Sequence, residues 1–116
     1  MSMSDRELLE FAAKAAGVGP VLCYETARNC LRIGPRSNYR LWNPLDDDSS
    51  VLQLARGLGI CIQFIPECDT AQVYQERCTT GEPYNIHVSA LGDIETRRII
   101  VQAAAEIGKA MQEQTI

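Results

Sequence analysis

The stretch VLCYETARNCLRIGPRSNYRLW, residues 21–42, contains short strand-like runs and no helical pattern between them. The runs are Val21–Thr26, Asn29–Ile33 and Tyr39–Trp42, and Gly34-Pro35 supplies residues typical of a turn. Strands that follow one another without an intervening helix pair in antiparallel fashion. We therefore predict two or three antiparallel strands here and an α+β fold, not an alternating α/β fold.

Helical patterns lie on both sides of this stretch. Ser4 and Glu7 form a capping-box pattern before an alanine-rich segment that stops at Gly17. Downstream, the acidic run Asp46–Ser50 offers several N-cap residues before a leucine-rich stripe that ends at Gly59. One helix is thus predicted before the strands and a second, shorter one after them.

The second half of the chain predicts more strands. Ile60–Ile65 is apolar enough to be a central strand, and Ala71–Arg77 and Tyr84–Ser89 fit a hairpin around the turn-like Thr79–Pro83. We expect one antiparallel sheet of about five or six strands. The N- and C-terminal helices would pack on one face of this sheet, with one short helix between strands, in a single domain covering residues 1–116.

A long helix of roughly five turns is predicted at the C-terminus, where Asp93 can cap its first turn. Its core stripe consists of apolar residues at helical spacing: Ile100, Ala104, Ile107 and Met111. A second run beside it contains Ile99, Ala103 and Ala110. Because small residues let helices approach closely, this second run predicts a homo-oligomer, most simply a dimer.

Composition restricts the class of protein. The 116 residues are 46% hydrophobic and carry a net charge of -4, which suits one soluble domain and argues against general binding to DNA or to an anionic membrane. No run of about 18 apolar residues exists, and the N-terminus passes directly into an amphipathic helix. We expect a cytoplasmic protein whose partners include neither a membrane nor a specific nucleic-acid sequence.

Few residues could carry catalysis or bind a metal. His87 is the only histidine, and the five cysteines include no Cys-x-x-Cys pair, so no zinc or redox motif is present. The triplet Asp46–Asp48 could ligate a divalent cation, but acids in the first turn of a helix are explained more simply as cap residues. A Cys78–His87 nucleophilic pair is conceivable but has no supporting feature. We expect a protein that is not an enzyme, with no catalytic residues, no metal and no cofactor.

Four arginines recur at four-residue intervals in a segment without acidic residues: Arg28, Arg32, Arg36 and Arg40. If residues 28–33 and 39–42 are strands, alternation places arginines on one face and apolar residues on the other. We expect Arg28, Arg32 and Arg40 to project together from the sheet as an anion site, because guanidinium grips phosphate and carboxylate. The alternative is a solvated edge that prevents aggregation.

A pocket for a nucleotide-like ligand would also need aromatic and amide groups. The candidate ligand-binding residues are therefore Arg28, Arg32, Tyr39, Arg40, Trp42, Asn43 and Arg97. Arg97 lies in line with the buried stripe of the last helix, where a structural ion pair or a ligand contact would both fit. Asp93 or Glu95 would be the nearest partner for an ion pair.

Residues 39–48, YRLWNPLDDD, followed by LQLARGLGI at 52–60, resemble a family of small proteins encoded by tailed bacteriophages and prophages. That family shares a Trp-Asn-Pro-Leu motif, acidic residues and a leucine-rich helix. Residues 5–17 and 93–111 are similar to the same group. The resemblance implies a phage origin and an approximate fold, and it transfers no catalytic residues.

Small phage proteins outside the virion are often inhibitors of host defence, regulators or adaptors, and some sequester nucleotide signals. The resemblance thus implies a non-enzymatic binding protein in the host cytoplasm that counteracts an antiviral defence, with a nucleotide-type signal held by the arginine cluster. An inhibitor that binds a host defence protein directly, and a regulatory adaptor without a small ligand, remain open as alternatives.

Overall fold

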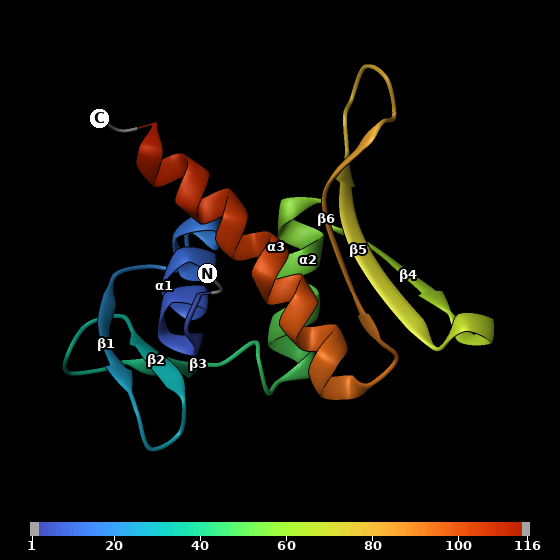
Figure 1. Cartoon of the computed structure of the whole chain (residues 1–116). Helices are drawn as coiled ribbons and strands as arrows, with labels where there is room; N and C mark the ends of the chain where they lie inside the picture. The colour runs from blue at the N-terminus through green and yellow to red at the C-terminus, as the bar shows by residue number, and fades with distance from the viewer. Residues whose placement is uncertain (1–2, 115–116) are drawn as a thin grey trace.

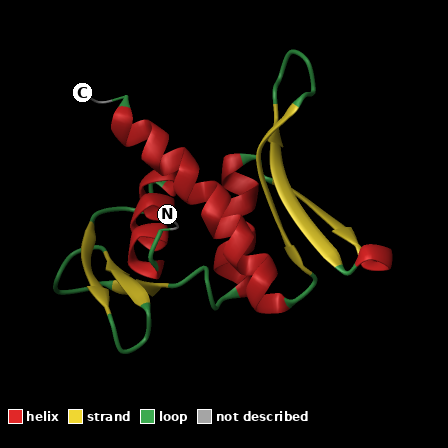
Figure 2. Cartoon of the chain, viewed as in Figure 1, coloured by secondary structure: helices red, strands yellow, loops and turns green. Residues whose placement is uncertain are grey.

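The computed structural model describes residues 3–114, which form helices packed between two separate sheets (Figures 1 and 2). The helices are α1 (Asp5–Ala16), α2 (Asp48–Leu58) and α3 (Asp93–Glu113). The first sheet contains β1 (Val21–Glu25), β2 (Cys30–Ile33) and β3 (Arg40–Trp42). The second contains β4 (Cys61–Ile65), β5 (Thr70–Glu76) and β6 (Pro83–Ala90), with the 3₁₀ turn η1 (Pro66–Cys68) between β4 and β5.

The α+β class and the antiparallel pairing are confirmed, but the expectation of a single sheet of five or six strands is wrong. The strands form two sheets, ordered β1-β2-β3 and β4-β5-β6. The helices separate them: α2 follows β3 and packs on α3, so the chain re-emerges on the other side of the helices before β4 begins (Figure 1). The buried face of α2 thus packs among the helices, and β3 remains an edge strand of the first sheet.

The helix boundaries follow the capping chemistry closely. Ser4 and Glu7 form the expected capping box, and Gly17 and Gly59 end α1 and α2 in the left-handed conformation. Within the acidic run, the N-cap is Asp47, whose carboxylate accepts the backbone N–H of Ser50. The N-cap of α3 is Gly92 instead of the expected Asp93, which is the first residue of the helix.

The alanine-rich faces of the terminal helices pack on each other instead of lying side by side on a sheet. Ala12 of α1 and Ala104 of α3 are fully buried. Contact is so close that a Cβ on Gly108 would lie 1.8 Å from the carbonyl oxygen of Phe11. This helix pair forms the centre of the hydrophobic core.

The second apolar run of α3 is used within the chain. Ile99 and Ala103 are both buried, and only Ala110 of that run is exposed. The face on which we based a dimer is therefore not open to a second copy. It is covered because the one helix packs on α1, α2, β5 and β6 together.

In the second sheet, the central strand is β5 and the expected central strand β4 is an edge. Ala71 and Val73 of β5 are fully buried, whereas the side chain of Phe64 on β4 is 56% exposed. Ile62 and Ile65 of β4 are half-buried and Phe64 is exposed, so the apolar composition of β4 does not reflect burial on both faces.

Candidate functional site

The register of the first sheet decides where its arginines point. Arg32 lies opposite Leu41 and Cys23, while Ile33 lies opposite Arg40. Residues paired across antiparallel strands share a face, so Arg32 is on the outer face and Arg40 is on the face of the buried Ile33. The expectation that Arg40 projects together with Arg32 is wrong, because alternation along one strand does not fix the register with its neighbour.

The Arg40 side chain instead contacts the segment that precedes β1. Its Nη2 donates to the backbone carbonyl of Val18 over 3.2 Å. That bond ties β3 to the segment that leads from α1 into β1. Arg40 therefore contributes to the attachment of the first sheet to the helices.

Glu25 is a member of the arginine cluster that sequence reasoning missed. Arg28 lies in the turn after β1, not in a strand, and its Nε and Nη2 donate to the Glu25 carboxylate over 2.6 and 2.9 Å. Arg32 Nε donates to the same carboxylate over 3.1 Å. The Arg28 hydrogen bond, partly opposed by desolvation and reinforced by Arg32, holds the pKa of Glu25 below its usual value. The useful sequence signal was the three-residue spacing of Glu25 and Arg28.

The remaining outward side chains form what we call the Arg32 face: Leu22, Cys23, Arg32, Arg36, Tyr39 and Leu41. The guanidinium carbon of Arg32 lies 4.9 Å from the centre of the Tyr39 ring, within cation–π range. Arg36 and Leu22 join them around an open hollow of about 320 Å³. Leu22, Tyr39 and Leu41 are all exposed, so this face combines cations, an aromatic ring and apolar area.

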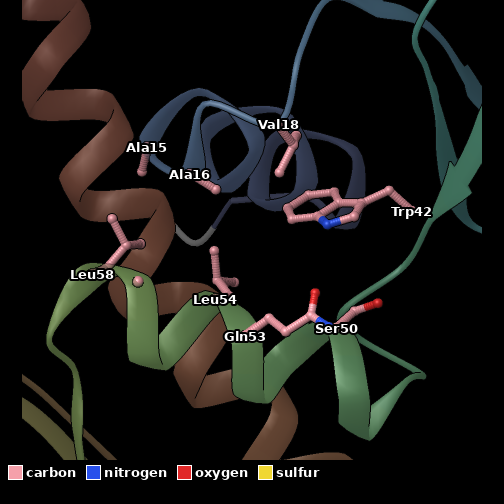
Figure 3. Close-up of a pocket in the computed structure, with 9 residues that line it drawn as sticks. Ala15, Ala16, Val18, Trp42, Ser50, Gln53, Leu54 and Leu58 are labelled. Carbon is pink, nitrogen blue, oxygen red and sulfur yellow. The ribbon is translucent and has the colours of Figure 1, made fainter.

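Trp42 belongs to the core and not to the Arg32 face. Its side chain is only 5% exposed and points between α1 and α2, where it lines a cavity of about 190 Å³ with Val18 and Leu54 (Figure 3). The register places Trp42 opposite Leu31, on the inner face of the sheet. It cannot stack on a ligand held by Arg32.

Asn43 holds the chain as it leaves β3. Its Nδ2 donates to the backbone carbonyl of Arg28 over 3.4 Å and to the Asp46 carboxylate over 3.3 Å. Its Oδ1 is buried without a hydrogen-bond partner in the structure. Asn43 thus links the β1–β2 turn to the segment before α2.

Arg97 is placed far from the first sheet's outer face and makes structural contacts. Its Nε donates to the backbone carbonyl of Leu45 over 3.0 Å, and its Nη1 donates to Asp48 over 2.7 Å. Only 14% of this side chain is exposed. Its partner is therefore Asp48 and not the expected Asp93 or Glu95, since helix packing brings the start of α2 against α3.

No catalytic geometry surrounds the single histidine in the described part of the chain. His87 lies on β6 opposite Val73, and its Nε2 is 2.9 Å from Oδ1 of Asn85. Partial burial lowers the pKa of His87, with Glu106 opposing that effect. Among residues 3–114, no three His, Cys, Asp or Glu side chains gather to hold a metal ion.

Charge is unevenly distributed along the chain. Residues 18–44 contain four arginines and one glutamate, a local net charge of +3 in a chain whose net charge is -4. The first sheet lies on one side of the helices and the second sheet on the other (Figure 1). Of these four arginines, Arg32 and Arg36 belong to the Arg32 face and make it basic, although the chain as a whole is acidic.

No protein-family model, curated protein or solved structure matches this chain. Within residues 3–114, none of the helices combines the length and the apolar character needed to cross a membrane.

Proposed function

We propose that this chain is a phage-encoded, non-enzymatic binding protein that counteracts a host antiviral defence in the host cytoplasm. In this proposal it docks its Arg32 face onto an acidic surface of a host protein. The observation that carries the proposal is the Arg32–Tyr39 pair: the guanidinium carbon of the half-buried Arg32 lies 4.9 Å from the ring centre of the exposed Tyr39, beside Arg36. The proposed phage origin rests on the resemblance of residues 39–60, together with residues 5–17 and 93–111, to phage proteins.

The composition of the Arg32 face favours a protein partner. Arginine and tyrosine are enriched at the centres of protein interfaces, where each supplies a large contact area together with a polar group. Leu22 and Leu41 add exposed apolar area beside them. The two cations of this face, Arg32 and Arg36, would also steer it toward an acidic partner.

Sequestration of a nucleotide by the arginine cluster has less support. The seven residues that we predicted for such a pocket are divided between the outer face, the core and α3. The Glu25 carboxylate already occupies the guanidinium groups of Arg28 and Arg32 and would repel a phosphate placed between them. The hollow beside Arg32 is at the lower end of the size range of ligand pockets.

The test compares tagged wild-type protein with the double variant Arg32→Glu, Tyr39→Ser as bait in lysate of a phage-sensitive host. We expect a host protein to be captured by the wild type and lost with the double variant. Arg56→Glu is the matched control, because it makes the same charge change at an exposed site on α2 and should retain the partner.

A nucleotide panel measured by thermal shift provides the second arm. A nucleotide that stabilises the wild type but not the Arg32→Glu, Tyr39→Ser variant would overturn protein docking and support sequestration. If capture survives in the double variant, the partner binds elsewhere and the assignment to the Arg32 face is wrong.

A further inference from the structure

The second sheet leaves a wide apolar groove beside the helices. β6 runs along α3, but the sheet diverges from α2 toward η1, so β4 stands away from the helices (Figure 1). The space between them is a groove of about 630 Å³. Val51, Ile62 and Ile100 form its floor, and Leu52, Phe64 and Leu91 line its sides.

The residues lining the sides are unusually exposed for their size. Leu52 on α2 is 58% exposed and Phe64 on β4 is 56% exposed, although both lie against the same groove. Leu91, in the turn before α3, is also exposed. Contiguous apolar surface of this kind on a folded domain marks an interaction site.

The whole chain also exposes more surface than a compact monomer of its mass. Its accessible area is 7149 Å². A monomeric protein of 12.8 kDa is expected to expose about 6,300 Å². The excess is comparable to the roughly 800 Å² that each partner contributes to a standard interface.

We infer that a second copy of this chain seats on this groove, forming a twofold dimer through Leu52, Phe64 and Leu91. In a twofold interface each patch meets its own copy, so the exposed apolar side chains of one protomer, Leu52, Phe64 and Leu91, would meet those of the other. The basic residue that lines the groove, Arg97, is already paired with Asp48 of its own chain. Dimerisation would therefore bury no unpaired cation.

This arrangement differs from the dimer that we predicted from sequence, and it is compatible with the proposed function. The groove is lined by residues of α2, β4, α3 and the turn before α3, and the second sheet lies on the opposite side of the helices from the first sheet (Figure 1). Both Arg32 faces would remain accessible in the dimer, giving two identical docking surfaces. Loss of the dimer and loss of partner capture are separate outcomes, since the two surfaces share no residue.

The test measures mass by light scattering coupled to size exclusion at about 100 μM, a concentration at which a micromolar interface is occupied. Wild-type protein should have twice the 12.8 kDa mass of the chain. Phe64→Arg should be monomeric. Val88→Arg is the matched control, because Val88 is a strand residue of similar exposure, 59%, on the opposite face of the same sheet.

Circular dichroism and thermal unfolding must show that Phe64→Arg is folded. Leu52→Arg, on an exposed helix position, provides a second monomeric variant should Phe64→Arg fail to fold. A monomeric wild type at this concentration would overturn the proposal. So would a dimer that persists in the folded Phe64→Arg and Leu52→Arg variants, or one that Val88→Arg alone disrupts.

Discussion

Arg98 Nη2 donates a hydrogen bond to Oδ1 of Asp5 over 2.7 Å, although 93 residues separate the two in the chain. The other oxygen of the same carboxylate accepts Nδ2 of Asn29 over 2.8 Å. One side chain at the start of α1 is thus bound both to α3 and to the β1–β2 turn. Through it the first sheet is fixed to the helix pair.

Asp5→Asn should destabilise the protein by about 1 kcal/mol at pH 7, a modest value because Asp5 is 35% exposed and solvent screens the pair. The Arg98 hydrogen bond, opposed by desolvation and reinforced by Asn29, lowers the pKa of Asp5 in the folded protein. Its contribution is therefore fully present above the unfolded pKa and is lost as the pH falls through the folded pKa. Urea unfolding of the wild type and of Asp5→Asn at pH 7 and at pH 2 measures the stability difference and its loss at low pH.

The control is Asp69→Asn, which removes the same charge from an exposed aspartate that directly follows η1. It should leave the pH dependence of stability close to that of the wild type. If the stability difference between Asp5→Asn and the wild type stays constant down to pH 2, the ion pair does not contribute as described.

Gly108→Ala should be strongly destabilising because its Cβ would lie 1.8 Å from a backbone atom of α1, which cannot move aside as a flexible side chain would. We expect a loss of about 3 kcal/mol in the free energy of unfolding, at the upper end of overpacking costs. Gly57→Ala is the matched helical control: nothing lies within 4 Å of its Cβ, so it should stabilise by about 0.5–1 kcal/mol. Thermal unfolding of both variants measures the contrast, and equal effects would contradict close packing of α1 on α3.

Removal of Arg97 should cost more than removal of its acidic partner. Arg97→Met leaves the buried carbonyl of Leu45 without its donor and should destabilise by about 2 kcal/mol. Asp48→Asn, at a carboxylate that is 85% exposed, should change stability by less than about 1 kcal/mol. Urea unfolding of both variants at pH 7 tests the ranking, and equal costs for the two variants would show that the Leu45 carbonyl contact adds little to the ion pair.

Local features of this fold were predictable because they depend on neighbouring residues. The capping box at Ser4, the glycine ends of α1 and α2 and the β5–β6 hairpin all follow from short-range chemistry. The division into two sheets was not predictable in this way. It depends on where α2 packs. An apolar sequence such as that of β4 is equally compatible with a central strand and with an edge strand whose Phe64 is exposed.

The candidate site shows the same limit. Four-residue spacing predicted that Arg28, Arg32 and Arg40 share one face of a sheet. Arg28 lies in a turn, however, and the pairing of Ile33 with Arg40 places Arg40 on the face opposite Arg32. Trp42 and Asn43 belong to the Trp-Asn-Pro-Leu motif, but their contacts are structural. Glu25 was not predicted as part of the site, because its contacts with Arg28 and Arg32 depend on the β1–β2 pairing that brings the three side chains together.

The five cysteines should differ in reactivity in a way that reports on the first sheet. Cys23, Cys68 and Cys78 are exposed, Cys61 is half-buried and Cys30 is buried. Burial, aided by Glu25, raises the pKa of the Cys30 thiol and disfavours the reactive thiolate. An aromatic disulfide reagent should therefore label three thiols rapidly, and Cys30 only after denaturation. Cys30→Ser should leave the number of rapidly labelled thiols unchanged. Rapid labelling of all five thiols in the wild type would contradict a stable first sheet.

Glu25→Gln should strengthen binding of the Arg32 face to anionic surfaces. The change removes the carboxylate that accepts hydrogen bonds from Arg28 and Arg32, and it raises the local charge of residues 18–44 from +3 to +4. Because the folded pKa of Glu25 is lowered, the wild type keeps this carboxylate ionised until the pH falls below the ordinary range of a glutamate. Only below that range should the wild type approach the variant.

The salt concentration that elutes each protein from a heparin column measures the effect. Glu10→Gln is the matched control, since it makes the same change in net charge on α1, where Glu10 pairs with Arg6. Glu25→Gln should elute at higher salt than Glu10→Gln at pH 7; coincident elution would mean that the Arg32 face does not meet the anion, and would remove the electrostatic basis of the proposed docking.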